Sequence, residues 1–171
     1  FRGRGFQHAP QFGNHAADGG GVFYSTLYNC TVVGNYAWHA GGGVADWGNG
    51  TRVMNSIIYS NQAGAYPNWA GSGGGSSIFF TNSCTFPTNI LWSAGNTTND
   101  PLCVAYGDGY GTNHVPGNYR LQTASPCVNV GSNQSWMTYA ADLDGKVRIR
   151  YRTVDMGAYE LIYGGTIYRC H

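Results

Sequence analysis

The side chains best suited to binding an ion lie in the last third of the sequence. The segment "DLDG" places Asp142 and Asp144 directly before Gly145. Alternating carboxylates before a glycine are typical of the start of a calcium-binding loop. The rest of an EF-hand loop is missing, because no glutamate follows at the required distance, so the alternative is a turn whose aspartates accept backbone N–H groups. We therefore expect no obligatory cofactor, with calcium at this segment as the alternative.

A run of positive charge follows in "VRIRYR", residues 147–152. If this segment is a strand, alternate side chains point to opposite faces. One face then carries three arginines: Arg148, Arg150 and Arg152. Such a stripe predicts contact with an acidic polysaccharide or a neighbouring subunit. The alternatives are pairing with nearby aspartates or simple exposure to water.

Catalytic residues are not visible as a group. The chain has eight Asp and Glu residues among 171. A lyase acting on acidic polysaccharides needs several carboxylates around calcium and a base, and a glycosidase needs two opposed carboxylates. We therefore expect that the protein is not an enzyme, and a polysaccharide lyase-like enzyme fragment is the less favoured alternative.

Aromatic side chains make up 15% of the chain and offer another kind of binding. On an outer face they stack on sugar rings or pack against another chain, whereas inside they are core. Trp38 in "NYAWHA" and Trp69 in "GAYPNWAG" lie in loop-like surroundings. We expect these two tryptophans to be exposed and to bind glycan.

Five cysteines are spread over the chain without the close pairs of a zinc site. The favoured disulfide joins Cys103 to Cys127, with Cys84 as an alternative partner of Cys103. The other interpretation is that some of these residues are small buried hydrophobes.

Composition limits the class of protein. Charged residues are only 10%, glycines number 27, and the net charge is +1, so electrostatic binding of nucleic acid is not expected. No run of about 18 apolar residues could span a membrane. An extracellular or cell-surface β-protein fits best. Because the chain begins at Phe1 rather than Met, we expect a processed piece of a longer precursor, although an expression boundary would look the same.

Three similar segments recur along the first half of the chain: "GGGVFYSTLYNCTVVGN", "GGGVADWGNGTRVMNSIIYSN" and "GGGSSIFFTNS". The interval from Gly21 to Gly43 is four positions shorter than the interval from Asn29 to Asn55. The difference places a short insertion in the loop "ADWGNGT". A recurrence at this spacing indicates a repeat architecture.

Each repeat contains short β-branched and aromatic runs, namely "TVV", "SIIYS", "SIFF" and "NILW". These runs are too short for helices and predict strands of stacked coils. Glycines would form tight turns, and the recurring asparagines would stack as a hydrogen-bonded ladder. The alternative is a glycine-rich sandwich with accidental similarity.

Two groups of motifs resemble known bacterial families. "NCTVVGN", "GGGV" and "NSIIYSN" resemble rungs of right-handed parallel β-helix surface proteins, including polymorphic outer-membrane-protein-like repeats. "NDPLCV", "GNYRLQTASPCVNVGSN", "DLDGKVRI" and "TVDMGAYE" resemble, in order, the closing block of secreted β-helix proteins with a choice-of-anchor Q domain. The resemblance implies a secreted or surface-displayed right-handed β-helix.

Together these features predict an all-β protein, a short right-handed parallel β-helix (β-solenoid) in four parts. The expected parts are an irregular N-terminal arm (1–18), β-helix rungs (19–98), a loop-rich closing block (99–160) and a C-terminal tail (161–171).

The favoured function is structural: a β-helix subunit that assembles end to end with its own copies into a surface filament, because no cap is visible at the N-terminal end of the solenoid. Self-assembly is expected at the two chain ends, through Phe1, Arg2, Arg4, Phe6, Tyr163, Ile167, Tyr168 and Cys170. The alternative is an adhesin module that binds cell-surface polysaccharide.

Overall fold

The computed structural model describes residues 6–7, 10–48, 50–72, 77–86 and 94–163. The protein is all-β, and its strands are short because glycines and asparagines interrupt each apolar run. The described residues before the closing block form fourteen strands: β1 (Phe6–Gln7), β2 (Pro10–Phe12), β3 (His15–Asp18), β4 (Val22–Phe23), β5 (Leu27–Tyr28), β6 (Thr31–Val33), β7 (Tyr36–Ala40), β8 (Val44–Asp46), β9 (Thr51–Met54), β10 (Ile57–Ile58), β11 (Gln62–Ala65), β12 (Trp69–Gly71), β13 (Ile78–Thr81) and β14 (Cys84–Thr85).

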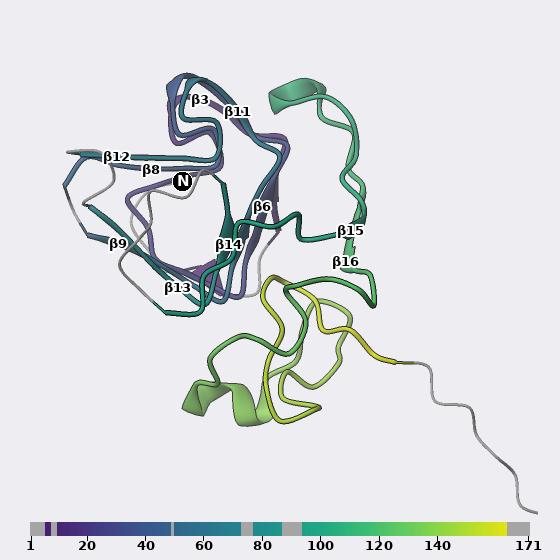
Figure 1. The fold of residues 1–171 in the computed structure, drawn as a ribbon. Helices are drawn as coiled ribbons and strands as arrows, with labels where there is room; N and C mark the ends of the chain where they lie inside the picture. Colours follow the sequence, from purple (N-terminus) through teal and green to yellow (C-terminus); the bar gives the residue numbers. More distant parts are fainter. Residues whose placement is uncertain (1–5, 8–9, 49, 73–76, 87–93, 164–171) are drawn as a thin grey trace, which may run out of the picture.

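These strands form four parallel sheets with the orders β1-β5-β9-β13, β14-β10-β6-β2, β11-β7-β3 and β12-β8-β4. Neighbouring strands in every one of these sheets are therefore four places apart along the chain. Successive turns of the chain stack on one another, as Figure 1 shows in purple to teal. We call these turns coil 1 (β1–β4), coil 2 (β5–β8) and coil 3 (β9–β12). Stacked parallel sheets of this kind are compatible with a β-solenoid.

The pairing register confirms the predicted repeat. Val22 pairs with Val44, and Thr31 pairs with Ile57, so the second interval is again four positions longer than the first. The insertion accordingly lies in the loop between β8 and β9, where coil 2 passes into coil 3. The predicted runs "TVV" and "SIIYS" contain β6 and β10, and "SIFF" covers all but the last residue of β13. The run "NILW" lies outside the described residues.

The triple glycines let adjacent coils approach closely. A Cβ on Gly20 would lie 2.4 Å from the carbonyl oxygen of Tyr36, and one on Gly42 would lie 2.3 Å from that of Gln62. Gly41 has a φ of +67°, a conformation that costs glycine little. The sequence therefore repeats glycine where two backbones meet at a turn.

The predicted asparagine ladder is also present. The Nδ2 of Asn35 donates to Oδ1 of Asn61 at 2.9 Å, and Nδ2 of Asn14 donates to Oδ1 of Asn35 at 2.9 Å. A second pair lies at a corner with positive φ, where Nδ2 of Asn55 donates to Oδ1 of Asn29 at 3.4 Å. The amide of Asn35 also donates to the carbonyl oxygen of Gln11 in coil 1, whereas the amide of Asn55 donates to that of Ser132 in the closing block.

The prediction of an irregular arm over residues 1–18 is wrong for its described part. β1, β2 and β3 belong to coil 1, and His15 pairs with Tyr36 in register. The repeat is visible in "QFGNHAADGGG", which matches "VVGNYAWHAGGG" once a gap after "HA" is allowed for. The polar residue Gln11, which pairs with Val32, hid this coil.

The closing block packs against the coils with loops and two further strands. β15 (Cys103–Ala105) pairs antiparallel with β16 (Asn118–Leu121), and the block also contains two short 3-10 helices, η1 (Gly111–Asn113) and η2 (Ser135–Tyr139). Gly157 N donates to the carbonyl oxygen of Asn55 at 2.8 Å, and Ala158 N donates to Thr31 Oγ1 at 3.0 Å. These bonds fix the block to coils 2 and 3.

Two apolar clusters form the interior. One lies within the coils and contains Val22, Leu27, Cys30, Val32, Val44, Val53, Ile58, Trp69, Ile78 and Phe80. The other lies between the coils and the closing block and contains Val33, Ile57, Cys84, Cys103, Tyr119, Leu121, Cys127 and Met156. Among the described residues, no helix has the length and apolar character needed to cross a bilayer.

Candidate ligand-binding groove

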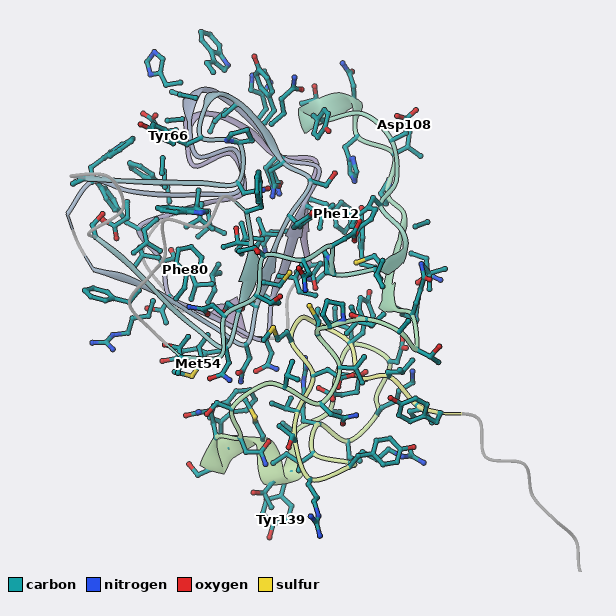
Figure 2. The ribbon with its side chains drawn as sticks, viewed as in Figure 1. Phe12, Met54, Tyr66, Phe80, Asp108 and Tyr139 are labelled. Atoms are coloured by element: carbon teal, nitrogen blue, oxygen red, sulfur yellow. The ribbon has the colours of Figure 1, made fainter. Side chains whose placement is uncertain are left out.

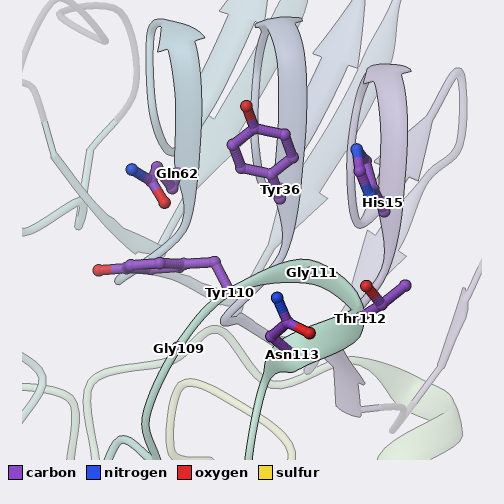
Figure 3. A pocket seen from close by; sticks show the side chains of 8 residues that line it. All are labelled: His15, Tyr36, Gln62, Gly109, Tyr110, Gly111, Thr112 and Asn113. Atoms are coloured by element: carbon purple, nitrogen blue, oxygen red, sulfur yellow. The ribbon is translucent and has the colours of Figure 1, made fainter.

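Three neighbouring strands present a row of outward side chains. His15 begins β3, Tyr36 begins β7 and Gln62 begins β11, and the three are aligned in the parallel register. Figure 3 shows their side chains side by side, one from each coil. The coil stacking therefore places an imidazole, a phenol and an amide along a single line.

The loop that carries η1 forms the other wall. Figure 3 shows the ring of Tyr110 below the side chain of Gln62, next to this row. The walls enclose a groove of about 350 Å³, which is lined by His15, Tyr36, Gln62, Gly109, Tyr110, Gly111, Thr112 and Asn113.

His114 holds this loop against coil 2. Its Nδ1 lies 2.9 Å from the carbonyl oxygen of Gly109, and its Nε2 lies 2.6 Å from the hydroxyl of Tyr119. The ring packs on Gly34, where an added Cβ would lie 2.3 Å from it, and Gly111 N donates to Gly34 O at 2.9 Å. These contacts hold the backbone on both sides of Tyr110.

The surface continues from His15 towards Trp38. Trp38 is 64% exposed, and its Nε1 donates to Nε2 of His15. His15, Ala16, Ala17 and Trp38 line a second hollow of about 350 Å³, and a third of about 500 Å³ runs from Asn14 to Phe23. Because His15 lines all three, they form one extended surface.

The first groove combines aromatic rings with polar side chains. None of its eight described lining residues is Asp, Glu, Lys or Arg. Aromatic faces pack on the C–H faces of sugar rings, and amides and hydroxyls both donate and accept hydrogen bonds. Tyr36, Tyr110, Gln62 and Asn113 together fit a neutral, hydroxyl-rich ligand.

The two tryptophans predicted to bind glycan differ in their placement. Trp38 is exposed, as expected. The prediction for Trp69 is wrong, because this residue is 5% exposed and its ring packs edge-on against Phe80 at 5.4 Å. Its loop-like sequence context hides the fact that β12 pairs with β8, which turns the indole into the apolar cluster.

The predicted arginine stripe is also wrong. Residues 147–152 form no strand, and Arg148 is fully buried, whereas Arg150 and Arg152 are exposed. Nη1 of Arg148 donates to Glu160 Oε1 and to Gly157 O, both at 3.0 Å. The alternating sequence pattern therefore did not distinguish the buried Arg148 from the exposed Arg150 and Arg152.

Asp142 and Asp144 form the turn that was the alternative to calcium. Asp142 Oδ1 accepts N–H groups from Asp144 and Lys146, both at 2.8 Å. Asp144 pairs with Arg120 and Lys146, and the Arg120 hydrogen bond lowers the pKa of Asp144 to about 2. Among the described residues, no three metal-binding side chains gather into a site. Calcium at this turn stays a prediction.

The predicted disulfide between Cys103 and Cys127 is not present. Neither residue is in a disulfide in the structure, although both are buried in the same cluster. The interpretation as small buried hydrophobes describes their present environment.

Most of the predicted self-assembly residues cannot be placed. Phe1, Arg2, Arg4, Ile167, Tyr168 and Cys170 lie outside the described residues. The backbone of Phe6 belongs to β1. Tyr163 is 43% exposed and meets Tyr151 edge-on at 5.5 Å. Self-assembly through the chain ends therefore stays a prediction.

Tyr110 had no direct signal as a binding residue in the sequence. It lies far from Tyr36 along the chain, in a glycine-rich loop that shares no repeat with the coils. His15 and Gln62 were detectable only as equivalents of Tyr36 after the repeat was aligned. Comparison with protein-family models, curated proteins and solved structures gave no match.

Proposed function

We propose that this protein binds a neutral polysaccharide in the groove between the coils and the η1 loop. The single observation that supports this most is the Tyr110 ring, set across the outward row of His15, Tyr36 and Gln62. It supplies a stacking surface beside several uncharged hydrogen-bonding groups. The row continues over Trp38, so an extended chain of sugars is a better ligand than a single one.

The setting of the groove belongs to the same proposal. We take the stacked coils to be a right-handed parallel β-helix, because parallel strands joined by crossovers are almost always right-handed. We take the protein to be extracellular or displayed on a cell surface. Low charge, abundant glycine and asparagine, and the resemblance of the closing block to secreted β-helix proteins support this location.

The groove is tested with an array of neutral and acidic oligosaccharides, using wild-type protein and the variants Tyr110→Ala and Trp38→Ala. Each variant is expected to weaken binding of the neutral ligand by about fivefold, since an aromatic stacking contact contributes about 1 kcal/mol. The matched control is Tyr139→Ala. Tyr139 is 97% exposed and lies in the closing block. Figure 2 shows it at the opposite end of the molecule from Tyr66.

Two outcomes would overturn the proposal. One is the absence of binding to every neutral oligosaccharide. The other is binding that Tyr110→Ala and Tyr139→Ala change equally. Binding restricted to acidic oligosaccharides and lost in Arg150→Ala would place the ligand on the exposed arginines instead.

End-to-end assembly into a filament is the second candidate, and one feature of coil 1 favours it. Oδ1 of Asn35 accepts hydrogen bonds from the backbone N–H and the side-chain amide of Asn14. Oδ1 of Asn61 accepts the same two kinds of bond from Asn35. Oδ1 of Asn14 receives no such donor from the described residues, and β2, β3 and β4 lie at the edges of their sheets. An open edge is a template for another strand. Electron microscopy of untagged protein would show regular filaments, and monomers at high concentration would exclude this candidate.

A further inference from the structure

Three of the four described cysteines meet where the closing block packs on the coils. Cys84 is on β14, Cys103 is on β15, and Cys127 is in the turn after β16. All three belong to the apolar cluster at this seam, whereas Cys30 belongs to the cluster within the coils. The fold therefore gathers sulfur atoms from three segments that lie far apart in the sequence.

Within this group the sulfurs are not equivalent. The thiol of Cys127 is near enough to Cys84 to help raise the pKa of the Cys84 thiol, and Cys84 Sγ lies 3.3 Å from the carbonyl oxygen of Asn99. Cys103 instead lies beside Tyr106, whose hydroxyl accepts the Cys103 backbone N–H at 3.4 Å. Cys84 and Cys127 are thus neighbouring thiols in the cluster, whereas Cys103 lies beside a phenol.

Backbone bonds hold both members of this pair in place. Cys84 N donates to the carbonyl oxygen of Ser56 at 2.8 Å, which anchors β14 to coil 3. Cys127 N donates to Ser125 Oγ at 3.1 Å, and the Cys127 carbonyl accepts Met156 N at 2.9 Å. The backbones of both cysteines are therefore held at the seam between the coils and the closing block.

We propose that Cys84 and Cys127 form a disulfide when the protein folds in the presence of a small-molecule disulfide oxidant. The bond would join β14 to the closing block covalently and would leave Cys103 reduced beside Tyr106. This inference concerns the seam and does not depend on the groove.

The chemistry balances with oxidised glutathione as the oxidant. The thiolate of one cysteine attacks the oxidant and releases one reduced glutathione, which leaves a mixed disulfide. The thiolate of the second cysteine then attacks the protein sulfur, forms the intramolecular bond and releases a second reduced glutathione. The two thiol protons pass to the two glutathione thiolates.

Burial determines when this reaction takes place. The neighbouring thiol of Cys127 and then burial raise the pKa of the Cys84 thiol, and burial raises the pKa of Cys103 to about 12. The thiolate is the reacting form, so the fully folded protein reacts slowly. Oxidation is expected during folding or in a partly opened state.

The test uses full-length protein with Cys170→Ser, which removes the tail cysteine as a competing thiol. The protein is refolded with mixed reduced and oxidised glutathione, denatured, alkylated without reductant and digested with chymotrypsin. Cleavage after Trp92 and after Tyr106 places Cys84, Cys103 and Cys127 on three different peptides. Mass spectrometry then identifies which peptides are linked.

The expected product is a single crosslink between the Cys84 and Cys127 peptides, with Cys30 and Cys103 alkylated. The Cys103→Ser variant should form the same crosslink, and the oxidised protein should unfold at a higher denaturant concentration than the same protein after reduction. Alkylation of all four cysteines after refolding would overturn the proposal. A crosslink from Cys103 to Cys127 or to Cys84 as the main product would overturn it equally.

Discussion

Replacing Asn61 with alanine should lower the free energy of unfolding by about 3 kcal/mol, because the change leaves several buried polar groups without partners. Asn61 is 5% exposed. Its Nδ2 donates to Val32 O at 2.8 Å and to Tyr59 O at 3.0 Å. Its Oδ1 accepts the backbone N–H of Asn35 at 3.1 Å. One side chain therefore satisfies groups of two coils.

The control for this prediction is the next residue in the chain. Gln62 has an exposed side chain on the outer face of β11, so Gln62→Ala should change the free energy of unfolding by no more than about 0.5 kcal/mol. Both variants are compared with wild type by denaturant unfolding. Equal losses for the two variants would show that the ladder does not hold the coils together.

At a pH where Glu160 is ionised, replacing Arg148 with methionine should cost about 3–5 kcal/mol, the usual penalty for removing one partner of a buried ion pair. Arg148 is 0% exposed and bonds to Glu160 Oε1, to Gly157 O and, through Nη2 at 3.0 Å, to Ala158 O. Methionine has a similar length and no donors, so the two carbonyl groups and the carboxylate lose these donors. Arg150→Met removes an exposed arginine from the same segment and should cost about 0.5 kcal/mol or less.

The Arg148→Met deficit should also depend on pH. Burial, followed by the charge of Asp155, raises the pKa of Glu160 to about 8 from 4.5. A carboxyl whose pKa is higher in the folded protein stabilises the fold fully when the pH is below its unfolded-state pKa. This stabilisation is lost as the pH rises through its folded-state pKa. Without Arg148, ionised Glu160 loses its only described ion-pair partner. Unfolding measured near pH 5 and near pH 9 should therefore show the larger deficit at the higher pH, and a deficit equal to that of Arg150→Met at both pH values would contradict this role.

The coil architecture was predictable because it repeats. Each local choice in the sequence, such as the triple glycine before Val22 and Val44, occurs again at the position that stacks on it. Spacing alone places the inserted loop in "ADWGNGT", and the ends of β8 and β9 narrow it to the segment between Asp46 and Thr51. The first coil was missed because Gln11 and Pro10 take the places of apolar or β-branched residues in the later coils.

The groove was not predictable in the same way. It depends on where the η1 loop comes to lie, and the contact that fixes it joins Gly34 to His114, which are far apart in the sequence. Burial was equally hidden at Arg148 and Trp69, because it follows from packing against distant segments rather than from neighbours in the chain. Alternating residue types predict a strand, and a composition rich in glycine and proline predicts a loop. Neither pattern shows which side chains of that segment are buried.

The most direct test of the groove is a titration of isotope-labelled protein with the neutral oligosaccharide that binds best on the array, followed by nuclear magnetic resonance of backbone amides. We predict that the shifts concentrate at Gln62, at residues 109–113 and around Tyr36, and that Tyr110→Ala moves the midpoint of the titration to a higher ligand concentration. Shifts confined to the closing block, or none at saturating ligand, would contradict a saccharide-binding groove between the coils and the η1 loop.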